Sequence, residues 1–309
     1  MRMIHCYRQI DKFHAGYKNW CGGEIKLKEP LKGHTTFKIG GAADYFIEPK
    51  DINDLKLLLN LLKRYNISFL IIGAGSNILV SDQGISGAVI HLNSPYFKKI
   101  FFEADFVEVR AGCYLSRFIS AAGERGLSGC EFLSGIPGTA GGALIMNAGQ
   151  SREGRGFGDL VETATVMDDN GIVKTLLKKD LRFAYRRSNL AKYIILSAGI
   201  RLIKKNKKEI QNRIKEYLDY RRGSQDLIVP SAGCIFKNPA GNSAGKLIDL
   251  CGLKNRRIGD AGISSKHANF ILNMGNADSE SVLRLMRLIK KQVRARFNIV
   301  LKPEIKIWR

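Results

Sequence analysis

The chain has 309 residues, 45% of them hydrophobic, so it can bury a full core and form two or three structural units. Its formal net charge of +22 at pH 7 attracts phosphorylated ligands, but a general lysine bias explains the same number, and both interpretations stay open. Charge alone does not indicate nucleic-acid binding, because the sequence lacks helix-turn-helix, zinc-finger and RNP signatures and has no aromatic residues interleaved with its basic clusters.

Apolar periodicity predicts the elements of the first two hundred residues. Leucine and isoleucine residues at helical spacing behind a candidate N-cap, Asp51, predict a helix that ends near Tyr65. The apolar run at 68–72 predicts a strand directly after this helix. Later elements follow from the same patterns: strands at 84–92, 161–167, 172–177 and 194–203, a hairpin at 99–110 with its turn near 103–105, and a helix from Leu115 to Gly126.

The lysine-rich stretch after Leu202 marks a domain boundary, because charged residues replace apolar alternation there and a new helical pattern begins. A short helix is expected after Ser243 and a long helix from about Asp278 to Phe297. Residues 299–308 look like a strand that could return to the first unit. The predicted organisation is listed in chain order: an N-terminal extension at 1–30, a domain at 31–203 with two subdomains split near 97 and with 299–309 returning to it, and a second domain at 204–298.

Neither a membrane span nor a metal or disulfide site is indicated. The most apolar stretch, 69–80, is short and interrupted by glycines. The first ten residues mix charged and apolar side chains and lack the apolar run of a secretion signal. The six cysteines have no C-x-x-C spacing and no neighbouring histidine cluster. We therefore expect a cytoplasmic protein with reduced thiols, no membrane insertion and no metal.

The first glycine-dense segment, residues 71–80, carries a possible phosphate loop. Gly73 and Gly75 follow an apolar strand and expose backbone N–H groups that a phosphate can bind. The third glycine of the Rossmann fingerprint is missing and no clear helix follows, which argues against a doubly wound dinucleotide fold. On spacing alone, a plain structural turn explains this segment as well as a phosphate loop does.

The second segment, residues 135–149, is richer in glycine. Glycine loses more backbone freedom on folding than other residues, so this density favours a backbone that approaches a planar or phosphorylated ligand closely. Asn147 within the segment has an amide that can hydrogen-bond the edge of a heterocycle. The alternative is a tight loop without a ligand.

These two segments, preceded by residues 34–41 (HTTFKIGG), resemble the flavin-binding half of the UDP-N-acetylenolpyruvoylglucosamine (MurB) reductases. The resemblance continues through further motifs in order: 183–188 (FAYRRS), 231–239 (SAGCIFKNP), 244–249 (AGKLID), 267–271 (HANFI) and 302–305 (KPEI). It covers nearly the whole chain from about Leu31, and ordered motifs are more specific than any one alone. The chain looks like the shorter type of the family, because the interval from Arg186 to Cys234 leaves little room for an extra tyrosine-bearing loop.

The resemblance implies an α+β fold, with a two-part FAD-binding domain of the vanillyl-alcohol-oxidase (PCMH) type and a smaller α+β substrate-binding domain. It also implies a ping-pong reaction through FAD, in which NADPH is oxidised and UDP-N-acetylglucosamine enolpyruvate is reduced to UDP-N-acetylmuramate for peptidoglycan synthesis. The cofactor performs the redox chemistry, so the protein orients the ligands and manages charge and a proton. A monomer that binds no specific nucleic acid is expected.

Three residues match the catalytic positions of the family: Arg186, Cys234 and Glu304. Hydride addition pushes negative charge onto the enolpyruvyl carboxylate, which a fixed cation such as Arg186 stabilises. Cys234 stands where the family more commonly has serine, and a thiol donates a proton more readily than an alcohol. Glu304 either shares the proton or orients a partner, and both roles stay open. Without the resemblance, a buried apolar cysteine and a surface glutamate are the ordinary interpretations.

The resemblance also implies ligand-binding residues. FAD is expected to be bound by Gly40, Gly73, Ala74, Gly75, Ser76, Asn77, Leu79, Gly135, Ile136, Pro137, Gly138, Thr139, Gly142, Ala143, Asn147, Ala148 and Gly149. The UDP-sugar is expected to be bound by Tyr185, Gln225, Lys237, Asn238 and Lys246, with Arg222 as a weaker choice. Two other functions stay open: a flavin-dependent oxidase of an alcohol or sugar on the same fold, and a basic nucleic-acid-binding or interaction protein that has lost catalysis.

Overall fold

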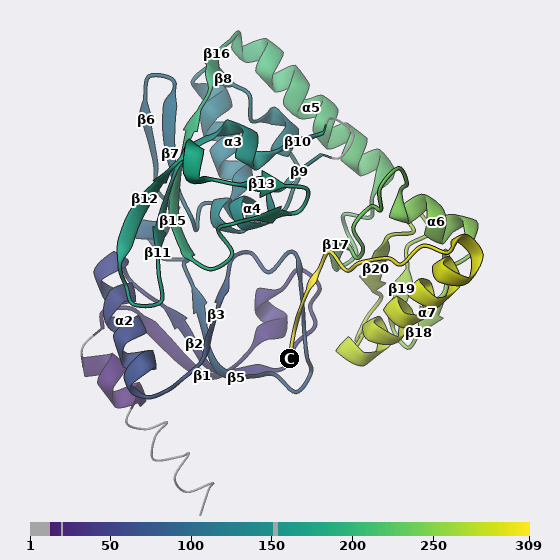
Figure 1. The fold of residues 1–309 in the computed structure, drawn as a ribbon, viewed down its shortest axis with the longest axis horizontal. Helices are drawn as coiled ribbons and strands as arrows, with labels where there is room; N and C mark the ends of the chain where they lie inside the picture. The colour runs from purple at the N-terminus through teal and green to yellow at the C-terminus, as the bar shows by residue number, and fades with distance from the viewer. Residues whose placement is uncertain (1–12, 20, 151–153) are drawn as a thin grey trace, which may run out of the picture. The chain divides into compact units, whose positions relative to one another are not determined.

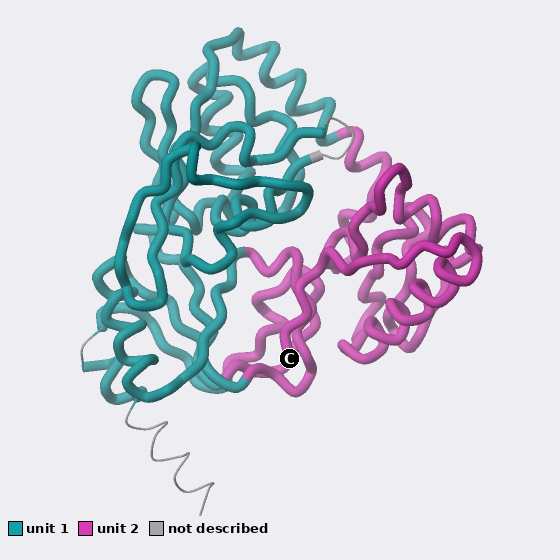
Figure 2. Tube along the Cα trace, viewed as in Figure 1, with its two compact units in different colours: residues 1–28, 44–73, 86–218 teal, residues 29–43, 74–85, 219–309 magenta. Residues whose placement is uncertain are grey.

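The computed structural model describes residues 13–19, 21–150 and 154–309, and the predicted absence of a secretion signal falls on residues outside this part (Figure 1). The chain forms two compact units, distinguished by colour in Figure 2. They are drawn from these segments: unit 1 from 1–28, 44–73 and 86–218, and unit 2 from 29–43, 74–85 and 219–309. Within the described residues, no helix is both long and apolar enough to cross a membrane.

Helix α2 (Ile52–Arg64) confirms the helix predicted behind Asp51, whose carboxylate accepts hydrogen bonds from the N–H groups of Asn53 and Asp54 at 2.9 and 3.0 Å. Its buried leucines share one hydrophobic cluster with apolar residues of a four-stranded sheet. The strands of this sheet, in spatial order, are β1 (Glu24–Pro30), β2 (Ala42–Glu48), β5 (Ile85–His91) and β3 (Phe69–Ile72). The predicted strands at 68–72 and 84–92 are confirmed, whereas β1 lies within the predicted N-terminal extension, for which no element was predicted.

A five-stranded antiparallel sheet forms the rest of the unit 1 core, together with α3 (Leu115–Glu124) and α4 (Ala140–Met146). Its strands, in spatial order, are β12 (Val173–Leu177), β11 (Val161–Met167), β15 (Ile194–Arg201), β7 (Phe106–Arg110) and β6 (Ile100–Glu103). The predicted hairpin at 99–110 is confirmed, and Ala104 in its turn has φ 52°. The predicted helix after Leu115 is confirmed as well.

Unit 2 contains a four-stranded antiparallel sheet and two helices, α6 (Ala244–Leu250) and α7 (Ser279–Phe297), whose buried apolar residues form a second hydrophobic cluster. Both helices match the predictions from the sequence. The strands of the sheet, in spatial order, are β17 (Ser231–Cys234), β20 (Phe270–Asn273), β19 (Ala261–Ile263) and β18 (Arg257–Ile258). The final strand, β21 (Lys306–Trp308), pairs in parallel with β4 (Ile78–Val80).

Helix α5 (Lys207–Ser224) confirms the helix predicted in the lysine-rich stretch, and the division between the two units falls within it, after Leu218. Ile210 is its one fully buried residue among those described.

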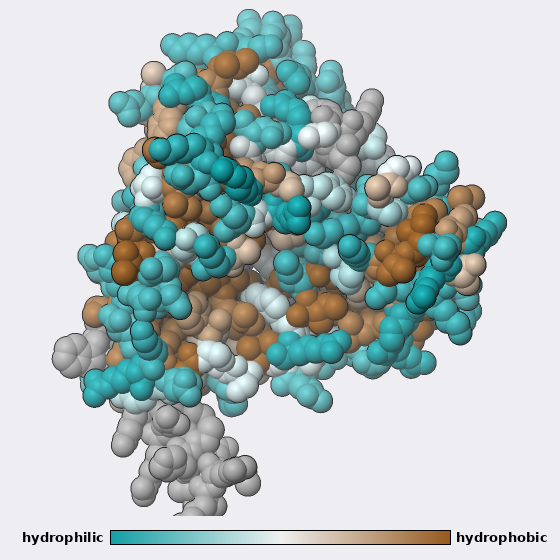
Figure 3. Space-filling model, viewed as in Figure 1, coloured by the Kyte–Doolittle hydropathy of each residue, from teal (hydrophilic) through white to brown (hydrophobic). Residues whose placement is uncertain are grey.

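In the space-filling view, hydrophilic residues cover much of the visible face and leave only small apolar patches (Figure 3).

Short strands and 3-10 turns connect these elements. The strands are β8 (Leu127–Ser128), β9 (Gly149–Gln150), β10 (Arg155–Gly156), β13 (Phe183–Ala184), β14 (Arg187–Ser188) and β16 (Ile203–Lys204). The 3-10 turns are η1 (Leu31–His34), η2 (Pro95–Lys98), η3 (Glu131–Leu133), η4 (Phe157–Leu160) and η5 (Lys178–Asp180). The sequence patterns did not predict these pieces, because they are too short to show a periodicity.

Removing the N-cap of α7 should destabilise unit 2. The Asp278 carboxylate accepts a hydrogen bond from the Ser281 N–H at 2.6 Å, and hydrogen bonds from the Ser281 backbone and side chain lower the pKa of Asp278 below its ordinary 3.8. A lowered folded-state pKa stabilises the fold above pH 3.8, and this contribution disappears as the pH falls through the folded value. Asp278→Ala should therefore cost about 1 kcal/mol at neutral pH, measured by urea unfolding.

The matched control is Asp278→Asn, which keeps a capping acceptor but no titrating group. It should retain most of the stability at pH 7 and lose the pH dependence that residue 278 contributes. An alanine variant as stable as the parent at pH 7 would contradict the capping role.

Candidate active site

Gly73 and Thr139 bring the two glycine-dense segments together within unit 1. A Cβ atom built on Gly73, directly after β3, would lie 2.5 Å from the Thr139 Oγ1 atom, a separation that real Cβ atoms essentially never show. Thr139 is also the N-cap of α4, where its Oγ1 accepts a hydrogen bond from the Gly142 N–H at 3.4 Å. One hydroxyl therefore contacts the first segment and caps the helix of the second.

The loop that leads into α4 presents backbone rather than side chains. It bends at Gly135 (φ 74°) and Gly138 (φ 152°), in the region that favours glycine. Gly142 is exposed, and a Cβ atom there would have only the Thr139 Oγ1 within 4 Å, at 3.6 Å. Accessible backbone without a filling side chain fits the close approach of a planar or phosphorylated group, as in the FAD that the resemblance implies.

In unit 2, residues 74–79 pack against the motif at 34–41. Gly75 has φ 62°, and a Cβ atom on it would overlap the His34 carbonyl oxygen. The Gly75 carbonyl accepts a hydrogen bond from the Thr36 N–H at 3.2 Å, and the Thr36 Oγ1 donates to the Ser231 carbonyl at 2.7 Å. Gly40 has φ 138° and faces Val80 closely. The first motif of the family resemblance thus supports both the glycine turn and the start of β17.

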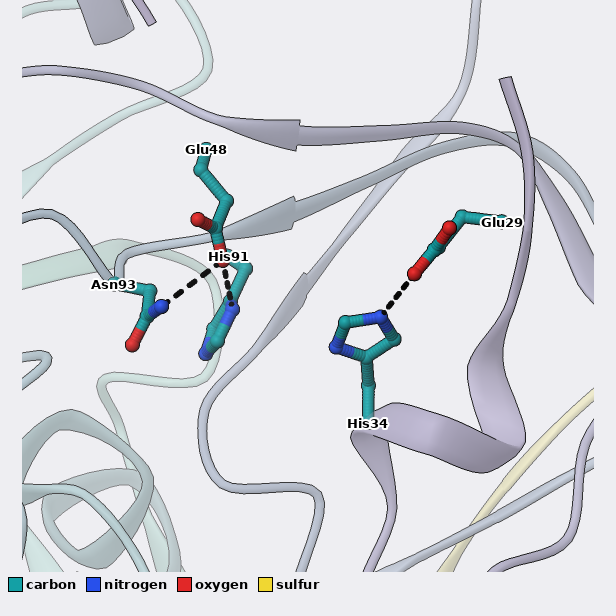
Figure 4. A network of polar contacts seen from close by, with 5 residues as sticks. All are labelled: Glu29, His34, Glu48, His91 and Asn93. Atoms are coloured by element: carbon teal, nitrogen blue, oxygen red, sulfur yellow. Dashed lines mark hydrogen bonds and ion pairs between the residues drawn. The ribbon is translucent and has the colours of Figure 1, made fainter. Parts of the chain in front are cut away.

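Two histidine–carboxylate pairs stabilise turns in their own units (Figure 4). In unit 2, Nε2 of His34, the last residue of η1, lies 2.8 Å from Oε1 of Glu29 in β1. In unit 1, Glu48 Oε1 lies 2.7 Å from His91 Nδ1 and accepts a hydrogen bond from Asn93 Nδ2 at 3.1 Å. The described part of the chain has no cluster of three or more His, Cys, Asp or Glu side chains suited to a metal ion.

Arg186 lies in the two-residue turn between β13 and β14. Its φ of 54° is in the left-handed region that glycine and asparagine usually occupy in such turns, so the backbone stores strain of about 1 kcal/mol or more there. The guanidinium donates to the Gly149 carbonyl at 3.1 Å and lies 5.2 Å from the ring centroid of the exposed Tyr185. Strain of this kind concentrates at functional positions, and it draws attention to Arg186 independently of the family motif.

Asn147 fixes the Arg186 hairpin on α4. It ends the helix with φ 43°, its Oδ1 accepts from the Gly158 N–H at 2.8 Å, and its Nδ2 donates to the Ala184 carbonyl at 3.2 Å. On the other strand of the hairpin, the Ser188 hydroxyl donates to the Ile145 carbonyl at 2.9 Å. The Asn147 amide thus bonds protein backbone on both its atoms, and a ligand bond from this side chain would use its second lone pair or second N–H.

Cys234 and Glu304 lie on neighbouring stretches of unit 2. Cys234 is the last residue of β17, follows Gly233 with φ 72°, and is partly exposed. The next residue, Ile235, accepts a hydrogen bond from the Glu304 N–H at 2.8 Å, and Phe236 forms an antiparallel bridge with Pro303. The structure therefore brings two of the three candidate catalytic residues close together, whereas Arg186 belongs to unit 1.

Two candidate substrate residues of unit 2, Asn238 and Lys246, lie at the start of α6. Asn238 Oδ1 accepts from the Ala244 N–H at 3.0 Å, and the Ser243 hydroxyl caps the helix at the Lys246 N–H. Lys246 is exposed and Lys237 is partly exposed. The Gln225 Oε1 atom is buried and has no hydrogen-bond partner within the described residues.

Sequence reasoning missed the role of the motif at 267–271, although it identified the motif. Asn269 is 2% exposed and bonds the chain next to Cys234 at three points: Oδ1 accepts from the Phe236 N–H at 3.0 Å, Nδ2 donates to the Phe236 carbonyl at 2.7 Å, and the Asn269 carbonyl accepts from the Ile235 N–H at 2.8 Å. Burial lowers the pKa of His267, whose Nδ1 accepts from the Asn269 N–H at 3.3 Å. Only the clustering of family motifs could have pointed to Asn269.

Comparison with known proteins identifies relatives along the whole chain. Residues 224–308 match the family model described as UDP-N-acetylenolpyruvoylglucosamine reductase, C-terminal domain, and residues 43–177 match an FAD binding domain. The UDP-N-acetylenolpyruvoylglucosamine reductase of Caldicellulosiruptor saccharolyticus is 44% identical over 91% of each chain, and that of Bacillus subtilis is 38% identical over 92% of this chain and 94% of its own. The crystal structure of the Thermus caldophilus enzyme superimposes with a TM-score of 0.79 at 35% identity, covering 94% of this chain and all of that one.

Asn147→Ala should lower the unfolding free energy of unit 1 by more than the loss of asparagine's preference for a left-handed backbone would alone. It leaves the buried Gly158 N–H and the Ala184 carbonyl without their partner, at a cost of about 1–3 kcal/mol in unfolding free energy. Asn66→Ala is the matched control, because exposed Asn66 also has φ 52° and loses only its backbone preference, about 1 kcal/mol. If thermal unfolding gave equal losses of stability for the two variants, Asn147 would not hold the Arg186 hairpin through its side-chain hydrogen bonds.

Proposed function

The chain belongs to the UDP-N-acetylenolpyruvoylglucosamine reductase family, and from this premise we propose that it reduces UDP-N-acetylglucosamine enolpyruvate to UDP-N-acetylmuramate with NADPH, as an FAD-dependent step of peptidoglycan precursor synthesis. The fold class is the expected α+β architecture with an FAD-binding domain. The observation that carries the proposal is the pairing of the Cys234 and Glu304 segments in unit 2, because it brings a proton donor and a carboxylate together on fixed backbone.

FAD, when bound, supplies the hydride transfer from NADPH to the enolpyruvyl carbon. We propose that FAD is bound by Gly73, Gly135, Ile136, Pro137, Gly138, Thr139, Gly142, Ala143, Asn147, Ala148 and Gly149 of unit 1, and by Gly40, Ala74, Gly75, Ser76, Asn77 and Leu79 of unit 2. Glycines at these turns keep side chains out of the approach to the main chain. Arg186, Cys234 and Glu304 are then proposed to stabilise the negative charge that hydride transfer creates and to supply the proton that completes the reduction.

Arg186 is proposed to stabilise the negative charge that develops on the substrate carboxylate. A guanidinium is always protonated and presents a planar pair of donors that matches a carboxylate. Its bond to the Gly149 carbonyl and the left-handed backbone hold it in place before substrate arrives. Such preorganisation avoids reorganisation during the reaction, and removal of one such donor typically costs about 100- to 1000-fold in rate.

Cys234 is proposed to donate the proton to the carbon that bears the ether oxygen. The Sγ–H bond breaks, a C–H bond forms, and the thiolate is reprotonated from solvent before the next turnover. Glu304 either shares that proton or acts as an orienting group, and its backbone N–H donates to the Ile235 carbonyl, next to Cys234. Cys234 replaces the more common serine without loss of chemical competence, because a thiol is the stronger acid.

The remaining assignments concern substrate and organisation. We propose that Tyr185, Gln225, Lys237, Asn238 and Lys246 bind the UDP-sugar, with exposed Lys246 and partly exposed Lys237 meeting its phosphates. Residues 31–203 with 299–309 are proposed as the FAD-binding domain, 204–298 as the substrate-binding domain and 1–30 as an extension. A cytoplasmic monomer is proposed, since the substrate is a cytoplasmic nucleotide sugar.

The purified protein should be yellow and should oxidise NADPH only when UDP-N-acetylglucosamine enolpyruvate is present. NADPH should bleach the visible flavin absorption, and the enolpyruvyl sugar should restore it much faster than oxygen does, because the residues proposed here serve a carboxylate acceptor. Rapid reoxidation by oxygen with peroxide release would instead support the oxidase alternative. Colourless protein that binds RNA tightly in a salt-sensitive manner would support the nucleic-acid alternative.

Cys234→Ala should block the step with the enolpyruvyl sugar and leave the step with NADPH intact. Loss of a general acid typically lowers the rate about 100- to 10,000-fold, and the NADPH step needs no such acid. Cys234→Ser is the control, because a hydroxyl can still donate, and it should support turnover. The measurement is stopped-flow absorbance of each half-reaction, and an equal loss of both in the alanine variant would refute the donor role.

A further inference from the structure

The backbone on which Cys234 lies leaves the regular sheet directly after it. β17 pairs with β20 at Ser231–Leu272 and at Cys234–Phe270, with a register shift between these two pairs. Two residues of β17, Ala232 and Gly233, therefore lie opposite one residue of β20, Ile271, which is the signature of a bulge, and Gly233 has φ 72°. A bulge changes the direction of the side chain that follows it, which here is Cys234. The pairing of β17 with β20 ends at this same residue.

Residues 235–237 are hydrogen-bonded on both of their edges. On one edge, the Glu304 N–H donates to the Ile235 carbonyl at 2.8 Å and the Lys237 N–H donates to the Lys302 carbonyl at 2.9 Å. Backbone groups of an extended chain alternate in direction, so the N–H and carbonyl of Phe236 point to the opposite edge. There, both are bonded by the amide of Asn269, at 3.0 and 2.7 Å.

The Asn269 side chain thus acts as a one-residue extension of β20. Its amide offers one acceptor and one donor with the geometry of a peptide group, as the missing ladder would have done. It is 2% exposed, and neither bond could be replaced by water without opening the core around it. Because Ile235 also donates to the Asn269 carbonyl at 2.8 Å, three bonds from one residue hold the two residues after Cys234.

We propose that Asn269 is a positioning residue for proton donation, which fixes the Cys234 thiol relative to the Glu304 carboxylate by holding residues 235–236 against the segment at 302–304. The inference rests on the proposed donor role of Cys234. Asn269 itself does not touch the reacting atoms. Proton transfer requires heavy-atom distances of about 2.6–3.2 Å, so a small displacement of this backbone removes the donor from reach.

Two variants and a matched control test this role. Asn269→Asp keeps the shape and replaces the donor to the Phe236 carbonyl with an acceptor, and Asn269→Ala removes both side-chain bonds. Asn273→Ala is the control: Asn273 lies on the same strand, is buried, and bonds Phe37, Gly275 and Ala277 instead. The readout is the ratio of the rate with the enolpyruvyl sugar to the rate of reduction by NADPH.

Both Asn269 variants should lower this ratio about 10- to 100-fold, whereas Asn273→Ala should lower the melting temperature and leave the ratio unchanged. Should Asn269→Ala fail to fold, the isosteric aspartate variant decides the outcome. An unchanged ratio in the aspartate variant, or an equal fall in the Asn273 control, would overturn the inference, because either result is what a purely structural residue would give.

A second arm does not depend on activity. Amide hydrogen exchange should show the Phe236 N–H protected in the parent protein and exchanging at least 10-fold faster in Asn269→Asp, with the Glu304 N–H following it. An unchanged exchange rate of the Phe236 N–H in Asn269→Asp would show that the Asn269 side chain does not hold this backbone. Parent enzyme whose bleached flavin is not restored by the enolpyruvyl sugar would defeat the proposed function instead, and the exchange result would still report on Asn269.

Discussion

Buried backbone N–H and carbonyl groups need partners even where a strand or helix stops, and this requirement governs the surroundings of both sets of candidate catalytic residues. In unit 1, the Asn147 amide bonds Gly158 and Ala184 where α4 ends, and in unit 2 the Asn269 amide bonds Phe236 where β17 ends. A primary amide suits this task because it carries both a donor and an acceptor, like the peptide group that it replaces. Irregular backbone beside the reactive side chains is therefore held as firmly as regular structure.

The reactive side chains themselves depend on unusual backbone. Arg186 has a left-handed conformation, and Cys234 follows a glycine in that region at a bulge. The Arg186 conformation is unfavourable for a residue with a side chain, and both segments are held by hydrogen bonds to residues distant in the chain. Both side chains therefore project from the end or the turn of a paired strand. This arrangement suits chemistry in which the cofactor transfers the hydride and the protein only supplies charge and a proton.

Elements with a long, clear period were predictable from the sequence, whereas elements defined by distant partners were not. The leucine spacing of α2, the alternation of β11 and the apolar face of α7 are local signals, and all three appear as expected. The strand β1 lies in a segment without such a signal, and its only neighbour in the described sheet is β2. Likewise, residues 29–43 and 74–85 join residues 219–309 in one compact unit, a grouping that no local pattern reveals.

In the candidate site, too, local motifs were predictable from the sequence, whereas contacts between distant residues were not. Cys234 and Glu304 were identified through their motifs, and their neighbouring positions follow from pairing across nearly seventy residues of chain. The glycine segments suggested close backbone approach, and the Gly73–Thr139 contact is such an approach. Asn269 could not be singled out, because a buried asparagine beside an apolar strand has no distinctive spacing. Its partner lies 33 residues earlier in the chain, and only three-dimensional proximity connects the two.

The parallel pairing of β21 with β4 has a consequence for biosynthesis. Residues 306–308 supply the hydrogen-bonding neighbour of residues 78–80, and the Lys306 N–H donates to the Asn77 carbonyl at 2.9 Å. A ribosome releases β4 first and β21 only after almost all of the described chain has emerged. The glycine turn ahead of β4 therefore waits, with an open strand edge, until translation of this region is complete. Pairing at that edge of unit 2 is thus a late event in assembly, however early unit 1 collapses.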